Sequence, residues 1–170
     1  MKLLGKKKVR MKELLTEFSK FKKCILDNKN RFIRLKNVKI NELNVNHLVI
    51  TQIKELYDNL DGLMESCSKL VAKTKIMHFL LPNLIPPMDR RYTMKFFKKY
   101  LPTIKLEKDK EKEKEIKIFL GVFEKMIKIS KDLDFESLRE KDKEFTPNIP
   151  KAIDNAIIGW VKKNLNKKIN

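Results

Sequence analysis

Hydrophobic residues recur at intervals of three and four along most of this chain, which is the spacing of amphipathic helices. The pattern predicts helices near residues 11–25, 48–60, 63–71, 76–81, 92–100, 116–133 and 153–165. Between residues 31 and 40, apolar and polar positions partly alternate, which indicates a short extended segment or a loop. We therefore expect a mainly α-helical fold with about seven helices.

Polar residues and prolines mark where the central helices begin and end. Thr74 is placed to cap the helix at residues 76–81, and Pro82 ends that helix. This helix is apolar on nearly every side, which is typical of a helix buried at the centre of a domain. Asp89 is placed to cap the next helix, at residues 92–100. The sequence thus predicts two consecutive helices joined by a short loop.

The chain of 170 residues is long enough to bury one hydrophobic core and too short for two domains of ordinary size. Within this single domain we distinguish a basic N-terminal segment, a core region with the candidate site, a charged loop or helix start, and the C-terminal helices, at residues 1–40, 44–102, 103–117 and 118–170. In the charged part, six lysines alternate with five acidic residues between positions 105 and 117.

The formal net charge of +18 narrows the class of partner. Fourteen basic residues lie between positions 2 and 39, against three acidic ones. Such a field makes a small domain repel itself, and a polyanionic partner is the simplest physical reason to keep it. Nucleic acid, with DNA first, is therefore the expected partner. The alternative is a lysine-rich, solvated surface without a specific partner.

The remaining composition bears on compartment and source. No apolar run approaches the roughly 20 residues that a membrane-spanning helix needs, and the N-terminus lacks the apolar core of a signal peptide. Cys24 and Cys67 form neither a metal-ligand spacing nor a disulfide framework. We expect reduced thiols in a cytoplasmic protein, with a single disulfide as the alternative, and no metal or cofactor. Abundant lysine beside a single glutamine, Gln52, is typical of thermophilic proteins.

The N-terminal helix predicted near residues 11–25 has a basic outer face, and more basic residues precede it. We expect Lys6, Lys7, Lys8 and Arg10 to contact phosphates. Contacts of this kind add affinity without reading a base sequence.

The stretch KTKIMHFLLP at residues 73–82, followed by PMDRR at residues 87–91, resembles the helix-hairpin-helix DNA glycosylases, especially the 8-oxoguanine type. In that family a hairpin presents a lysine at the head of a buried helix, and an aspartate follows at the head of the next helix. Lys75 matches the lysine and Asp89 the aspartate. The resemblance implies a reduced form of that fold, in which Lys75 attacks the sugar as an amine to form a Schiff base and Asp89 supports departure of the base.

The resemblance also indicates which side chains would contact DNA. Arg90 and Arg91 are expected to contact phosphate, because arginine is scarce in this chain and both follow the candidate aspartate. The hairpin position, residues 70–73, contains no glycine, whereas the family's hairpin is glycine-rich so that backbone amides can approach a phosphate. Lys69 and Lys73 are expected to supply positive charge there instead.

Three functions stay open from the sequence. The first is DNA binding with base-excision glycosylase or lyase activity carried by Lys75 and Asp89. The second is a nucleic-acid-binding module that keeps the fold without the chemistry, in which Asp89 is a helix cap. The third is an interaction protein whose basic N-terminal helix docks on an acidic partner or a membrane surface.

A few other side chains have both a structural and a functional interpretation. We expect His78, on an apolar helix, to be a hydrogen-bonded core histidine rather than a base or ligand. Trp160 and the pair Phe96 and Phe97 could stack on an extruded base. For these aromatic residues we expect core packing instead.

Overall fold

The computed structural model describes residues 18–43, 47–60, 69–98, 112–141 and 143–166, and all regular structure in these ranges is helical. Its elements are α2 (Lys29–Leu35), the short 3-10 helix η1 (Ile40–Glu42), α3 (His47–Asn59), α4 (Lys69–Leu80), α5 (Thr93–Lys98), α6 (Lys112–Asp132), α7 (Phe135–Lys141) and α8 (Ile149–Asn166). Residues 18–27 are helical as well and lead into α2. The predicted mainly α-helical single domain is confirmed.

The predicted extended segment at residues 31–40 is wrong over most of its length. Its first five residues belong to α2, and Phe32 and Leu35 are buried there. These two side chains are three positions apart, so they lie on the same face of a helix. Extended backbone occurs at Lys39, immediately before η1. The partial alternation therefore came from a short amphipathic helix.

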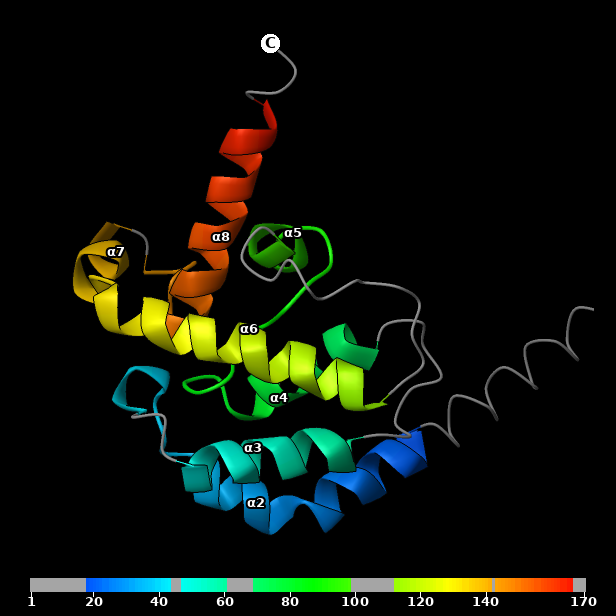
Figure 1. Cartoon of the computed structure of the whole chain (residues 1–170). Coiled ribbons are helices and arrows are strands. Elements are labelled where there is room, and N and C mark those ends of the chain that lie inside the picture. Colours follow the sequence, from blue (N-terminus) through cyan, green and yellow to red (C-terminus); the bar gives the residue numbers. More distant parts are fainter. Residues whose placement is uncertain (1–17, 44–46, 61–68, 99–111, 142, 167–170) are drawn as a thin grey trace, which may run out of the picture.

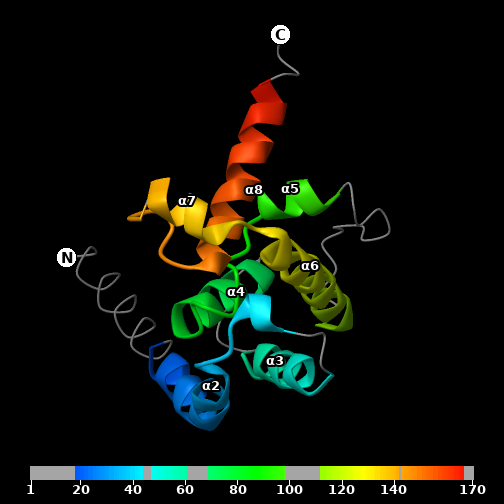
Figure 2. The same cartoon turned by 90° about the vertical axis from the view of Figure 1, so that its left-hand side faces the viewer.

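Helix α6 is the element around which the others are arranged, and it crosses the middle of the molecule in Figure 1. It contacts η1, α3 and α8. On one side of it α2 and α3 pack together, and on the other side α5 packs against α8 (Figures 1 and 2). The α2–α3 pair and the α5–α8 pair therefore lie at opposite ends of the molecule.

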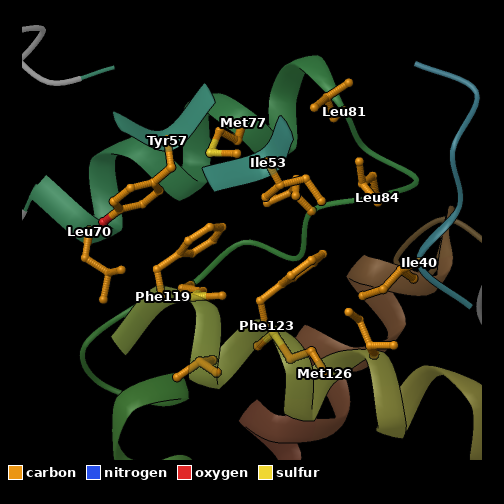
Figure 3. Packing of buried hydrophobic residues seen from close by; sticks show 14 of the residues in the cluster. Ile40, Ile53, Tyr57, Leu70, Met77, Leu81, Leu84, Phe119, Phe123 and Met126 are labelled. Carbon is orange, nitrogen blue, oxygen red and sulfur yellow. The ribbon is translucent and has the colours of Figure 1, made fainter. Parts of the chain in front are cut away.

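The core lies where α3, α4 and α6 face one another (Figure 3). The rings of Tyr57 and Phe119 stack with their centroids 4.3 Å apart, and Phe119 also stacks on Phe123 at 5.8 Å. Phe119 and Phe123 are one helical turn apart, as the predicted amphipathic pattern requires. Buried aliphatic side chains surround these rings, among them Ile53, Leu56, Met77, Leu81, Leu84 and Met126.

Helix α4 differs from its prediction in where it begins and in how it is buried. Thr74 lies inside the helix, and its hydroxyl donates a hydrogen bond to the Leu70 carbonyl oxygen at 2.9 Å. Residues 70–73 include no glycine or proline to break the helix, so they continue it and form no hairpin turn. Met77 is fully buried, whereas Phe79 is 83% exposed. The helix is therefore buried on one side rather than all round.

Candidate nucleic-acid interface

Lys75 lies in the middle of α4, and its side chain is exposed to solvent. The resemblance to glycosylases implies a lysine at the head of a buried helix that follows a hairpin. Here α4 already includes residues 70–73, which were expected to form the hairpin. Lys75 therefore neither follows a hairpin nor stands at the head of a helix.

Asp89 is a cap for the turn that leads into α5. Its Oδ1 accepts a hydrogen bond from the Tyr92 N–H at 2.6 Å, and its own N–H donates to Thr93 Oγ1 at 3.1 Å. This reciprocal pairing satisfies backbone donors that a helix start leaves open, and the predicted cap is confirmed. Among the residues that the structure describes, no hydrogen bond or ion pair joins Asp89 to Lys75.

Lys73 lies inside the protein, contrary to the expectation that it contacts a phosphate. Its side chain is 5% exposed, and its Nζ is 3.4 Å from Oε1 of Glu115 on α6. The same carboxylate oxygen accepts a hydrogen bond from the Tyr57 hydroxyl at 2.6 Å. The Lys73 Nζ also lies 4.3 Å from the centre of the Tyr57 ring. The charge of Lys73 therefore joins α4 to α3 and α6.

His78 links α4 to the buried loop that follows it. Its Nδ1 lies 2.7 Å from the carbonyl oxygen of Ile85, and Ile85 is fully buried. A buried carbonyl needs a hydrogen-bond donor, and a protonated Nδ1 supplies one. The predicted role of His78 as a hydrogen-bonded histidine is confirmed.

We expect the free energy of unfolding to fall as the pH drops below about 6.5, the ordinary pKa of histidine. Burial lowers the pKa of His78, while its hydrogen bond to Ile85 acts in the opposite direction. Because the unfolded chain takes up the proton first, acid stabilises the unfolded state. The stability that neutral His78 contributes is complete above the pKa of this histidine in the unfolded chain. It is lost as the pH falls through the lower pKa of His78 in the folded protein.

Urea denaturation at pH 7.5 and pH 5.5 measures this effect. The variant His78→Asn keeps a side-chain donor but does not titrate, so its stability should fall less between the two pH values. An equal fall in both proteins would show that another group is responsible.

The contact between α5 and α8 brings aromatic and basic side chains together at the surface. The guanidinium carbon of Arg91 lies 5.3 Å from the centre of the Tyr92 ring, and Nζ of Lys162 lies 5.9 Å from the same point. Both distances are within the range of cation–π attraction. The Tyr92 ring therefore contacts one cation from its own turn, Arg91, and one from α8, Lys162.

Trp160 completes this group. It meets Phe96 edge to face, with ring centroids 5.0 Å apart and an interplanar angle of 86°. Trp160 is 44% exposed, which corrects the expectation that it packs in the core. We call Arg91, Tyr92, Phe96, Trp160 and Lys162 the α5–α8 surface.

The exposed side chains of α5, of the turn before it and of α8 carry mainly positive charge. Exposed basic side chains in residues 89–98 and 149–166 are those of Arg90, Arg91, Lys95, Lys98, Lys162 and Lys163. The acidic side chains in the same two stretches are Asp89, which is the cap, and Asp154, which is buried. Asp154 accepts a hydrogen bond from Lys151 Nζ at 2.6 Å. Exposed basic side chains therefore outnumber the acidic ones in these two stretches.

The residues that were expected to contact phosphate do not all lie in one part of the structure. Arg90 and Arg91 are exposed next to Tyr92. Lys69 is the first residue of α4, in a different part of the chain. The N-terminal group of Lys6, Lys7, Lys8 and Arg10 lies outside the described residues.

Sequence reasoning missed Tyr92, Lys162 and Glu115. Tyr92 and Lys162 meet only because α5 packs on α8. The presence of Trp160, Lys162 and Lys163 close together on one helix was a signal in the sequence that could have indicated a surface with aromatic and basic side chains. Glu115 lies one turn before Phe119 on the buried face of α6. A charged residue at a core position of a helical pattern could have indicated a buried ion pair.

No protein-family profile matches the chain, and no curated protein or solved structure matches it. No helix within the described ranges has the length and apolar character needed to cross a membrane. In the same ranges, no cluster of three or more His, Cys, Asp or Glu side chains could hold a metal ion. The function therefore has to be inferred from the geometry of the chain itself.

Proposed function

We propose that this protein binds nucleic acid, with DNA as the first candidate, through the α5–α8 surface. The observation that carries the proposal is that Tyr92 contacts two cations, while Phe96, one turn further along, contacts the half-exposed ring of Trp160. Nucleic acids offer phosphates to cations and flat bases to aromatic rings. An acidic peptide offers anions, and a membrane surface offers anions beside an apolar interface, but neither is defined by planar bases that stack on aromatic rings. The net charge of +18 supports a polyanionic partner.

Among the functions open from the sequence, we propose the binding module without imine chemistry. Lys75 is exposed in the middle of a helix, and Asp89 Oδ1 already accepts a hydrogen bond from a backbone N–H. An amine nucleophile and its partner carboxylate need to share one site with the sugar. The described contacts of the two residues support separate roles.

We expect the double variant Arg91→Ser, Lys162→Ser to bind DNA less tightly and with a weaker dependence on salt. On duplex DNA each phosphate contact contributes about 0.9 to the slope of log affinity against log salt, so two lost contacts should lower the slope by about 1.8. If the affinities converge at 1 M salt, binding at 0.1 M should weaken roughly 60-fold. Fluorescence anisotropy of a labelled oligonucleotide at several salt concentrations measures both quantities.

The matched control is Arg34→Ser, Lys54→Ser. It removes one exposed arginine and one exposed lysine from α2 and α3, at the opposite end of the molecule. A smaller loss is expected for this control. Equal losses in the two double variants would point to a diffuse charge effect, and no binding by the parent protein at low salt would remove the proposal.

We further propose that the protein works in a reducing compartment such as the cytoplasm. The Cys24 thiol donates a hydrogen bond to the Asn59 carbonyl oxygen at 3.3 Å, a role that requires the reduced form. Burial raises the pKa of Cys24, which keeps the thiol protonated and less reactive. Fractionation of cells that express the tagged protein would decide the compartment, and recovery in an oxidising compartment would contradict the proposal.

A further inference from the structure

We infer that the α5–α8 surface takes unpaired nucleotides and stacks a base on Trp160. The inference rests on the proposed function, and it adds the class of nucleic acid and the residue that contacts the base. It follows from the exposure of Trp160, from the support beneath its ring, and from the backbone beside it.

The position of Trp160 on α8 leaves its ring beside the buried face of that helix. Ile153, Ile157 and Val161 are buried, and they form the stripe by which α8 packs on the domain. Trp160 directly precedes Val161 and follows Ile157 by three positions, so it lies at the edge of that stripe, about 100° round the helix from Val161 and about 60° from Ile157. With 44% of its surface exposed, it keeps a large apolar area in water that burial would remove. An apolar ring left in solvent offers a stacking face to a flat apolar ligand.

The ring is held in place by other aromatic residues. Phe96 meets Trp160 edge to face at 5.0 Å, and Phe96 meets Phe97 in the same way at 5.0 Å and 82°. Phe97 is 2% exposed and belongs to the hydrophobic core. Trp160 is thus connected to the core through two rings. A ring ordered before binding loses less conformational entropy when a ligand arrives.

Gly159 leaves bare backbone beside Trp160. A Cβ atom added to this residue would meet nothing within 4 Å, so packing gives no reason for glycine here. Glycine inside a helix also costs stability relative to alanine. The absence of a side chain does, however, allow a ligand to approach the helix closely next to the exposed ring.

Stacking and charge together favour unpaired nucleotides over a duplex. In a duplex both faces of each base are covered by neighbouring base pairs, so an aromatic side chain reaches a face only where a base is unstacked. Proteins that bind single strands combine aromatic platforms with a basic groove that follows the phosphates. The α5–α8 surface has both parts, because Arg91 and Lys162 lie over the ring of Tyr92, and Phe96, one turn further along, meets Trp160.

The test uses the fact that Trp160 is the only tryptophan in the chain. Its fluorescence should be quenched when the full-length protein is titrated with a single-stranded oligonucleotide of deoxyuridine or of uridine, which differ only at the 2′ position of the sugar. Equal response to the two would indicate recognition of bases and phosphates, and a preference for either would identify the sugar that is read. A duplex of the same length should bind more weakly and quench less.

Affinity measurements on variants complete the experiment. Trp160→Ala should weaken single-strand binding by roughly 5- to 150-fold, which is the effect of removing one base-stacking residue. Trp160→Phe keeps a smaller aromatic ring and is less disruptive to the fold. Its affinity for the single strand should lie between that of the parent protein and that of Trp160→Ala. The matched control is Phe145→Ala, which removes an aromatic side chain that is 62% exposed just before α8 and should have little effect.

The outcomes separate this inference from the proposed function. Binding to single strand and duplex with equal affinity, without quenching and without an effect of Trp160→Ala, would overturn the stacking inference and leave nucleic-acid binding intact. A complete lack of binding to either strand form at low salt would overturn both.

Discussion

Replacing Phe119 with alanine should lower the free energy of unfolding by about 3–5 kcal/mol, the usual cost of removing a buried phenyl ring. Phe119 is fully buried between the rings of Tyr57 and Phe123, at centroid distances of 4.3 Å and 5.8 Å. Removing it loses the transfer free energy of the ring and leaves a cavity where α3 and α6 meet. Urea denaturation followed by circular dichroism measures the change.

Phe79→Ala is the matched control for this substitution. The residue type and the change are the same, but Phe79 is 83% exposed on α4. Substitutions at such positions usually change stability by less than about 0.5 kcal/mol. A loss at Phe79 as large as the loss at Phe119 would mean that the exposed side of α4 is covered in solution.

Glu115→Leu should lower the free energy of unfolding by about 3 kcal/mol. The substitution leaves the ammonium group of Lys73, whose side chain is 5% exposed, without the carboxylate 3.4 Å away. It also removes the acceptor of the Tyr57 hydroxyl. Breaking one side of a buried ion pair costs more than the pair itself contributes, because the remaining charge stays desolvated.

Replacing the whole polar group should restore most of that loss. In the triple variant Lys73→Met, Glu115→Leu, Tyr57→Phe, no charge and no hydroxyl is left buried without its partner. The control is Glu124→Leu, which removes an exposed glutamate from the same helix and should have little effect. If Glu115→Leu were as harmless as Glu124→Leu, the Lys73 charge would have to be solvated or held by another partner.

The sequence alone was sufficient for the fold class and for several local roles. The helical spacing of Phe119, Phe123 and Met126 identified the buried face of α6. A period of 3.6 residues can be recognised within one helix, without knowledge of its neighbours. The cap at Asp89 was predictable for the same reason, since its partners Tyr92 and Thr93 are three and four residues away. Signals of this kind need no knowledge of the rest of the molecule.

Predictions failed where a local pattern had two structural solutions. Residues 31–40 fit partial alternation, but the burial of Phe32 and Leu35 against the rest of the domain selects a helix. Residues 76–81 are apolar on nearly every side, so their pattern does not say which side meets the core. Packing against α3 and α6 left Phe79 in solvent and Lys73 inside.

The candidate interface was decided by tertiary structure. Arg91 and Tyr92 are neighbours in sequence, yet Lys162 joins them from 70 positions further along the chain because α5 packs against α8. Lys73 and Glu115 meet in the same way across α4 and α6. The sequence determined which helices form and which side of most of them is apolar, since both depend on residues within a turn or two. Which charged and aromatic side chains share a surface depends on how all the helices pack, and that is a property of the whole fold.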